Sequence, residues 1–352
     1  MLQSTIIKDM LEFKALDANF QLLTLLTPTN VQWNRKYYTY GDFTIIIPVE
    51  QYSASIKYIY TKDRPETGEV KKMLKMEDTK YVQLSGYFLE RTLNDKVIYP
   101  TFYGSGQLIQ TVENMIRQYK EDIPIKEITH QEGLVSSTIE YQETGSELAD
   151  KCYETLQTQE MSYKCVYNFE NDELNVIIYK GEDKTQSAEG NEFVTFSTVQ
   201  DTIKNPTINI DKSKYKNYFI IAGSDKAENR IVAYLDLSNG NYKYKQFIDQ
   251  RDVQFDDEKQ TLEEYKEELI QKGLEKSLDY VIEQTVDFKI IPQGYEYMKD
   301  YDLGTKVDCV LDEYGIQLEA RIVEIYEVMK QGDISVEIKI GNVIRNKNNL
   351  RR

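Results

Sequence analysis

The alternation of hydrophobic and polar positions is clearest between residues 301 and 341. Every second side chain is apolar in three successive runs: Val307, Cys309 and Leu311; Ile316, Leu318, Ala320 and Ile322; Ile334, Val336, Ile338 and Ile340. The segments 312–315 and 330–333 are typical of turns. The phase slips between Ile322 and Ile325, which indicates a bulge. The pattern predicts three consecutive antiparallel strands that share one apolar face.

The first hundred residues are also predicted to be mostly strand. Apolar and aromatic runs separated by Gly, Pro and Asn occupy residues 20–26, 31–38, 40–48, 69–76 and 80–88. Pro48 cannot donate a backbone hydrogen bond, so it is predicted to end the third of these strands. Arg64 to Gly68 has the composition of a turn that precedes the last two strands.

A change in periodicity predicts a compact α+β domain over residues 101–185. Leu108, Val112, Met115 and Tyr119 share one helical face over residues 107–119. The Gly-Ser-Gly segment at 104–106 lacks the lysine of a phosphate loop, so it is interpreted as a flexible joint and domain boundary.

A second helix and a hairpin complete this predicted domain. Thr144 and Glu147 match a capping box, which predicts that the helix starts at Thr144 and ends near Gln159. Residues 163–169 and 174–179 then form the predicted hairpin across a polar turn.

Residues 186–255 return to strand patterns, and residues 256–285 are predicted to form an inserted amphipathic helix. Thr261 and Glu264 match another capping box in this segment. The best interpretation of the helix is that it packs on the chain's own β-structure rather than on a partner. Residues 286–345 carry the closing strands, and residues 346–352 form a basic tail.

The composition restricts the functional classes. The chain has 352 residues with 43 Lys and Arg against 59 Asp and Glu, so its formal charge is −16 and no sequence-specific nucleic-acid binding is expected. Apolar runs stay well below the roughly 20 residues of a membrane span, so no membrane partner is predicted. Met1 to Phe20 is too charged for a signal peptide, which predicts assembly in the host cytoplasm.

The sequence offers little catalytic chemistry. Cys152, Cys165 and Cys309 each lie on an apolar face and are predicted to be free and buried. The single histidine, His130, lies in a loop-like segment without a nucleophile motif. We therefore predict no catalytic residue, no cofactor and no metal site, and the protein is expected not to be an enzyme.

Three sets of residues carry a resemblance to a known family. The first set is a strand with Trp and Arg, followed after a short gap by Gly-x-Phe and a strand that leads to Pro. The second set, much later in the chain, is a Gly-ended strand and an Asp-x-Arg-Asp segment. The third set lies in the closing strands. The positions are Trp33, Arg35, Gly41, Phe43 and Pro48; Gly223, Asp249, Arg251 and Asp252; and Gly304, Gly315, Arg321 and Gly341. The Asp-Arg-Asp segment is interpreted as a hydrogen-bonded corner rather than a catalytic cluster. Together these features resemble the tail-hub (baseplate-hub) family of tailed phages and related contractile or bacteriocin-like particles.

The resemblance implies a mainly β fold with an α+β insertion. Two similar small antiparallel β-barrels of the tail-tube type are expected at residues 1–100 and at residues 186–255 with 286–345. It also implies a non-catalytic virion component, a homotrimeric hub at the tail tip that joins a sixfold tube to a threefold spike. The implied partners are a tail-tube or distal tail protein above, spike and baseplate proteins below, and a tape-measure protein in the lumen. Lytic or spike parts are expected on separate proteins.

The alternative from a different class is a cell-wall hydrolase or carbohydrate-binding module of the same particle. Exposed rows of aromatic side chains on a sheet would favour sugar binding. Two experiments distinguish the hypotheses: a turbidity assay on bacterial cell walls tests hydrolysis, and particle fractionation tests assembly into the tail.

Overall fold

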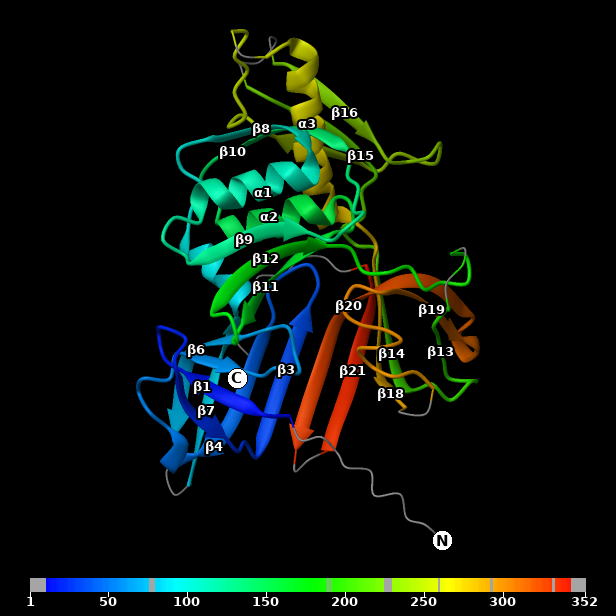
Figure 1. Cartoon of the computed structure of the whole chain (residues 1–352). Helices are drawn as coiled ribbons and strands as arrows, with labels where there is room; N and C mark the ends of the chain where they lie inside the picture. The colour runs from blue at the N-terminus through cyan, green and yellow to red at the C-terminus, as the bar shows by residue number, and fades with distance from the viewer. Residues whose placement is uncertain are drawn as a thin grey trace.

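The molecule consists of a broad β-sheet at one end and a helical part at the other (Figure 1). The computed structural model describes residues 11–75, 80–188, 190, 192–224, 230–258, 260–291, 294–330 and 333–342. The predicted basic tail, 346–352, lies outside these residues. No helix among the described residues is long and apolar enough to cross a membrane.

Two β regions, far apart in sequence, form one sheet of thirteen strands. The first region contributes β1 (Phe13–Leu16), β2 (Leu22–Leu26), β3 (Asn30–Lys36), β4 (Asp42–Pro48), β5 (Tyr58–Tyr60), β6 (Gly68–Lys75) and β7 (Tyr81–Phe88). The second contributes β13 (Thr195–Ser197), β14 (Ile203–Asp211), β18 (Glu283–Ile290), β19 (Lys306–Leu311), β20 (Ile316–Lys330) and β21 (Asp333–Asn342). The main path runs β14-β18-β21-β20-β3-β4-β7-β6-β5-β1-β2; β19 branches from β20, and β13 pairs with β19.

Each β region has its own core, built from the alternating positions of its strands. Trp33, Phe43 and Phe88 pack together in the first core, with ring centroids of Trp33 and Phe88 4.7 Å apart. The predicted meander forms the second core: β19, β20 and β21 pair antiparallel, and the predicted bulge occurs between Ile322 and Glu324. The sheets are therefore half-buried, as period-two alternation requires.

The two β regions are joined inside one chain by β3 and β20. Their antiparallel register places Trp33 opposite Glu327 and Arg35 opposite Ile325. The mainly β fold with few helices is confirmed, and it is an open path of strands with β2 at one end and β14 at the other.

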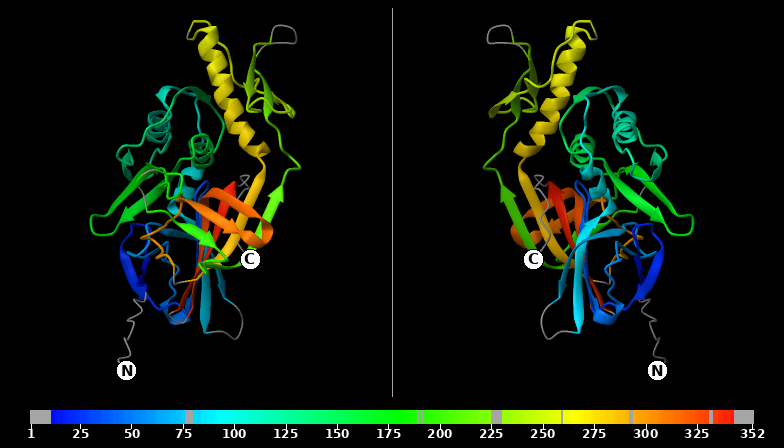
Figure 2. Two further views of the ribbon diagram at one scale, coloured as in Figure 1. Left: turned by 90° about the vertical axis from the view of Figure 1, so that its right-hand side faces the viewer. Right: turned by 90° about the vertical axis from the view of Figure 1, so that its left-hand side faces the viewer.

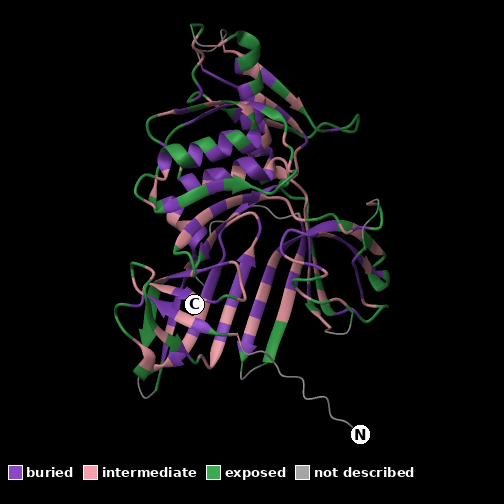
Figure 3. Cartoon of the chain, viewed as in Figure 1, coloured by how far each residue is buried: buried purple, intermediate pink, exposed green. Residues whose placement is uncertain are grey.

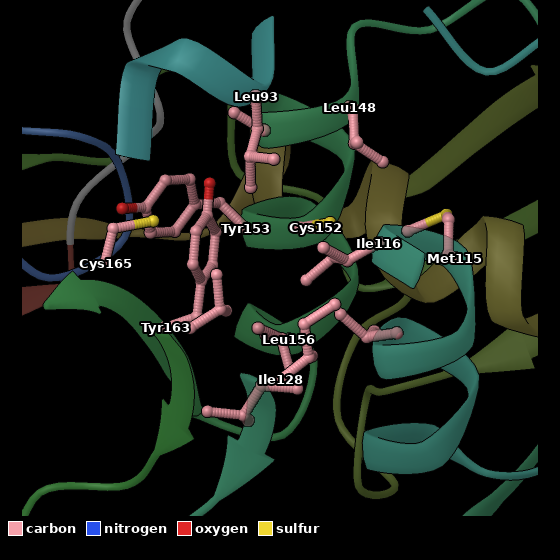
Figure 4. Packing of buried hydrophobic residues seen from close by; sticks show 14 of the residues in the cluster. Leu93, Met115, Ile116, Ile128, Leu148, Cys152, Tyr153, Leu156, Tyr163 and Cys165 are labelled. Carbon is pink, nitrogen blue, oxygen red and sulfur yellow. The ribbon is translucent and has the colours of Figure 1, made fainter. Parts of the chain in front are cut away.

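The predicted α+β insert follows the first β region. Its elements are β8 (Phe102–Gln107), α1 (Leu108–Tyr119), β9 (Ile125–His130), β10 (Thr138–Glu143), α2 (Leu148–Gln157), β11 (Ser162–Asn168) and β12 (Glu173–Tyr179). The predicted hairpin is β11–β12, and β9 adds to it in parallel. Side chains of both helices and of β11 interlock in its core, including Met115, Cys152 and Tyr163 (Figure 4).

Two local predictions in this insert were wrong. The Gly-Ser-Gly segment lies within β8 and pairs with β10, because cross-strand hydrogen bonding outweighs the flexibility of glycine. The second helix starts at Leu148, and its N-cap, Glu147, makes no side-chain cap. The expected Thr144 capping box therefore does not form, and Ser146 donates to Glu143 in the segment before the helix.

A separate small unit contains three strands and the longest helix. The strands are β15 (Tyr218–Ala222), β16 (Val232–Asp236) and β17 (Lys245–Asp249), and the helix is α3 (Leu262–Ser277). Among the described residues these strands pair only with each other. The sequence had predicted that they belong to the second β region, and they do not pair with it. Phe219, Ile221 and Leu269 belong to a core of their own, so α3 is needed to cover this sheet rather than the large one (Figure 2).

Candidate functional site

A buried network of charged side chains lies where the first β region meets the second. Arg35 on β3 points into the interior and is 3% exposed. Its Nε donates to Glu66 Oε1 at 2.7 Å, and its Nη1 donates to Tyr297 Oη at 2.8 Å and Asp302 Oδ1 at 2.5 Å. One guanidinium thus ties a strand of the first region to the segment that precedes β19.

Arg64 extends this network to β20. Its guanidinium binds both carboxylate oxygens of Glu327, with Nε–O distances of 2.9 Å, and Glu327 also accepts from Tyr297 Oη at 2.9 Å. Glu327 is fully buried. A buried carboxylate is stable only when it is paired and hydrogen-bonded, and here all of its partners come from other segments.

The electrostatics of the network keep both arginines charged. Burial by itself would lower the pKa of Arg35, but the carboxylates of Glu66 and Asp302 raise it well above its usual value. Burial raises the pKa of Tyr297 well above its usual value, so its hydroxyl stays protonated and can donate to Glu327. The network is therefore a fixed set of charges and donors, suited to holding elements in register.

A second cluster surrounds Arg321 and joins three parts of the chain. Arg321 donates to the carbonyls of Gly304 (2.5 Å) and Gly181 (3.2 Å) and pairs with Glu160 at 2.8 Å. Its guanidinium lies 5.7 Å from the ring centroid of Tyr37. The first region, the insert and the second region therefore meet around one side chain.

Gly304 shows why this cluster requires a glycine. Its φ is +88°, a conformation that other residues rarely adopt. A Cβ atom there would lie 2.4 Å from the ring of Tyr37. Beside the cluster is a cavity of about 280 Å³, lined in part by Arg321, Glu160 and Gly341.

The remaining signature residues serve local packing. Trp33 and Phe43 are core residues with centroids 5.6 Å apart. Pro48 ends β4, Gly315 has a φ of +61° in the turn before β20, and a Cβ on Gly41 would lie 2.2 Å from a backbone carbonyl oxygen.

Gly223 and the Asp-Arg-Asp corner lie in the small unit, apart from both clusters. A Cβ on Gly223 would lie 2.1 Å from Tyr265 Oη. Asp249 binds Arg230 at 2.6 Å and Arg251 at 3.0 Å. Arg251 is 70% exposed, and Asp252 is exposed as well. The corner is thus a surface ion pair whose inner cation, Arg230, was not anticipated from the sequence.

Another buried ion cluster fixes α3 to the insert. Lys151 on α2 lies 3.0 Å from both Glu143 and Glu275, and Lys272 on α3 lies 2.6 Å from Glu143. Burial opposes ionisation of Glu143, but the two lysines outweigh it and lower the pKa of Glu143 to about 2. The small unit is therefore held by charge pairs as well as by apolar contacts.

Five members of the buried network were not predicted from the sequence: Arg64, Glu66, Tyr297, Asp302 and Glu327. One signal was available, because Glu327 occupies the buried phase of β20 between Ile325 and Met329. A charged residue at an inward position predicts a buried partner. Arg64 is 263 residues from Glu327, and Tyr297 is 262 residues from Arg35, so no local pattern could supply these partners.

The predicted cysteines and histidine are located as follows. Cys152, Cys165 and Cys309 are free and buried, as predicted. His130 Nδ1 lies 2.7 Å from Glu113 Oε1 at the end of β9, and its side chain is 43% exposed. Among the described residues no group of three metal-ligating side chains is close enough to hold an ion.

The architecture defines a class, because solved phage-type tail proteins, two of them from prophages, share its fold along nearly their whole length. The tail protein from Neisseria meningitidis MC58 has a TM-score of 0.60 at 12% identity, covering 94% of this chain and 96% of that chain. The 43 kDa tail protein of prophage MuSo2 from Shewanella oneidensis has 0.58 at 14%, covering 94% and 98%. Prophage tail protein gp18 from Listeria monocytogenes EGD-e has 0.56 at 13%, covering 95% of both. At these identities the likeness is one of fold.

The family follows from the sequence itself. The model of the Siphovirus ReqiPepy6 Gp37-like proteins matches residues 12–342, and the chain belongs to this family. The membership in a phage tail-protein family that the motifs predicted is thereby confirmed. No curated protein matches the chain.

Proposed function

We propose that the protein is a structural component of a phage or phage-like tail and acts as a homotrimeric, non-catalytic hub. Family membership and the fold shared with tail proteins support the assignment to a tail. The observation that carries the trimer is the open main sheet, whose path ends at β2 in the first region and at β14 in the second.

Open strand edges seek partners. Leu22, Leu23 and Leu25 on β2 are 40–51% exposed, and β2 pairs only with β1 among the described residues. When β2 of one copy meets β14 of the next, the contact is heterologous and closes into a ring. Three copies then present six β regions, which matches a sixfold tube on one side and a threefold spike on the other.

We further propose roles for the parts of the chain and for its partners. The two β regions act as two similar tube-like units, and residues 101–185 lie between them in sequence. A tube or distal tail protein binds above, spike and baseplate proteins bind below, and a tape-measure protein passes through an acidic lumen. The protein would be found at the tail tip, after assembly in the host cytoplasm.

The carboxyl groups of Glu90 and Glu268 have a pKa that would suit a general acid, but their positions do not favour the alternative function, hydrolysis of cell walls. Burial raises the pKa of both Glu90 and Glu268 to about 7. Each is only 4% exposed; Glu90 accepts from the backbone of Cys165, whereas Glu268 lies on α3. A glycosidase needs two carboxyl groups that flank one accessible bond.

The test combines a charged β2 edge with imaging of the tail tip. Leu23→Lys with Leu25→Lys should leave the melting temperature of the monomer unchanged, because both side chains are exposed. It should raise the trimer dissociation constant about a hundredfold, by losing apolar burial and adding like charges. Val135→Lys, at a 75% exposed site in the insert, is the matched control.

Mass photometry of the purified protein and electron microscopy of particles give the outcome. A chain that stays monomeric at high concentration and appears as a single copy in the particle would contradict the hub proposal.

A further inference from the structure

The outer face of the small three-stranded sheet is aromatic and uncovered. One face of β15 supplies Phe219 and Ile221 to the core under α3. On the opposite face the register aligns Tyr234, Ile220 and Phe247 in one row across the three strands. Tyr234 is 60% and Phe247 52% exposed. Such a row costs free energy in water unless something covers it.

Cations surround this row. Lys243 and Lys245 lie 4.5 and 5.7 Å from the ring centroid of Tyr218, and Arg230 lies 5.9 Å from that of Phe247. Exposed Lys212 and Lys214 precede the first strand. Asp236 pairs with Lys243, and Asp249 pairs with Arg230 and Arg251. The face therefore remains basic in a chain of net charge −16.

The same unit carries a complementary surface around the start of α3. Leu262, at the start of α3, is 42% exposed. Exposed acidic residues lie around it in sequence: Asp257, Glu258, Glu263, Glu264 and Glu267. We call these residues the acidic surface: one apolar side chain, Leu262, among carboxylates. We call the row of Tyr234, Ile220 and Phe247 with its neighbouring ammonium and guanidinium groups the basic aromatic face.

The acidic surface and the lysines of the basic aromatic face lie at opposite ends of the unit, whereas Arg230 lies at the acidic end, because it donates to the carbonyls of Ala222 and Gly223 at the end of β15. The hydroxyl of Tyr265, near the start of α3, accepts a hydrogen bond from the backbone N–H of Ser224, just after the end of β15. The backbone N–H of Lys216, before the start of β15, donates to the carbonyl of Tyr280, just after α3. The acidic surface therefore lies at one pole and the lysines at the other, at an end of the molecule where many positions are exposed (Figure 3).

We propose that the basic aromatic face of one copy binds the acidic surface around Leu262 of the next copy of this chain. The inference rests on the proposed trimer and adds a second heterologous contact to it, far from the β2 edge. Opposite charges on two different surfaces of one chain fit a head-to-tail ring. Tyr, Phe and Arg are also the residues enriched at protein interfaces.

A charge swap tests the contact directly. Lys243→Glu with Lys245→Glu, or Glu263→Lys with Glu267→Lys, should each raise the trimer dissociation constant at least about tenfold, because like charges then oppose each other. All four substitutions in one chain should restore the parent value. Lys72→Glu with Lys75→Glu on β6 gives the same charge change at exposed sites of the first region and should have no effect.

Disulfide trapping gives an independent readout. Phe247→Cys with Leu262→Cys should yield covalent trimers after oxidation, whereas either single variant should not. A trimer that forms no such cross-link and ignores all charge reversals overturns this inference and leaves the hub proposal standing. A monomeric chain overturns both. Binding of purified cell-wall polysaccharide that is lost in Tyr234→Ala with Phe247→Ala, with an unchanged trimer, would assign the face to sugar instead.

Discussion

At the scale of single residues, the chain places charge where the apolar alternation predicts hydrophobic side chains. Arg35 shares a strand face with Val31 and Trp33, and Glu327 shares one with Ile325 and Met329. Both are buried, and both are paired across the seam between the β regions, Arg35 with Asp302 and Glu327 with Arg64. Such pairs specify which strands meet, because an apolar residue at either site would accept several neighbours.

Removal of the guanidinium from Arg35 should therefore be costly. Arg35→Ala leaves Glu66 and Asp302 without their cation and should lower the free energy of unfolding by about 3–5 kcal/mol. Arg251→Ala, at the exposed corner, should leave the free energy of unfolding unchanged within error. Urea denaturation of both variants makes the comparison, and equal losses would contradict the assignment of the seam as the structural centre.

Glu90 should make stability depend on pH. Burial raises the pKa of its carboxyl from 4.5 to about 7, so the native state binds this proton more tightly than the unfolded state. The resulting stability is fully present below about pH 4.5 and is lost as the pH rises through 7, by on the order of 3 kcal/mol. Glu268 acts in the same direction and window.

Glu90→Gln should flatten this dependence between about pH 5 and 8, because the amide cannot ionise and can still accept from the backbone of Cys165. The measurement is the free energy of unfolding against pH, with exposed Glu313→Gln as control. A slope equal to that of the parent would refute a raised pKa at Glu90.

At the scale of elements, the same four-residue pattern had two different outcomes. Thr261 caps α3, since its hydroxyl accepts from Glu264 N at 3.2 Å and Glu264 accepts from Thr261 N at 2.7 Å. Thr144 and Glu147 have the same spacing, but the helix that follows starts four residues after Thr144. An isolated bridge between Glu147 and Val97 holds that segment extended.

The pair provides a matched test. Thr261→Ala should lower the free energy of unfolding by about 1 kcal/mol, the usual contribution of an N-cap hydroxyl. Thr144→Ala should have no effect, because that side chain caps no helix. Chemical denaturation of both variants decides it, and a comparable loss at Thr144 would show that α2 begins earlier in solution.

At the scale of the whole molecule, four cores are joined by polar seams. The apolar clusters of the two β regions, the insert and the small unit are distinct. Arg35, Arg321 and the Lys151–Glu275 pair lie where these parts meet. The predicted ring depends on this rigidity, because the β2 edge and the charged poles of the small unit reach a neighbour only if all parts keep their relative positions.

Local periodicity accounts for a large part of this architecture. It located the meander of β19, β20 and β21 with its bulge, the strands of the first region, α1 and the hairpin of β11 and β12. Signals of this kind work because a side chain's position in a strand or helix depends on a few neighbouring residues. The three buried cysteines followed from the same periodicity.

Only the tertiary structure decided which elements pair. Strands β15–β17 have the pattern of any half-buried strands, and their separation from the second β region depends on the cover that α3 provides. Two partners of Arg35, Tyr297 and Asp302, and one partner of Glu327, Arg64, likewise come from segments more than 260 residues away. Hydrogen bonds between strands and ion pairs in a core are made by proximity in space, which alternation along the chain does not encode.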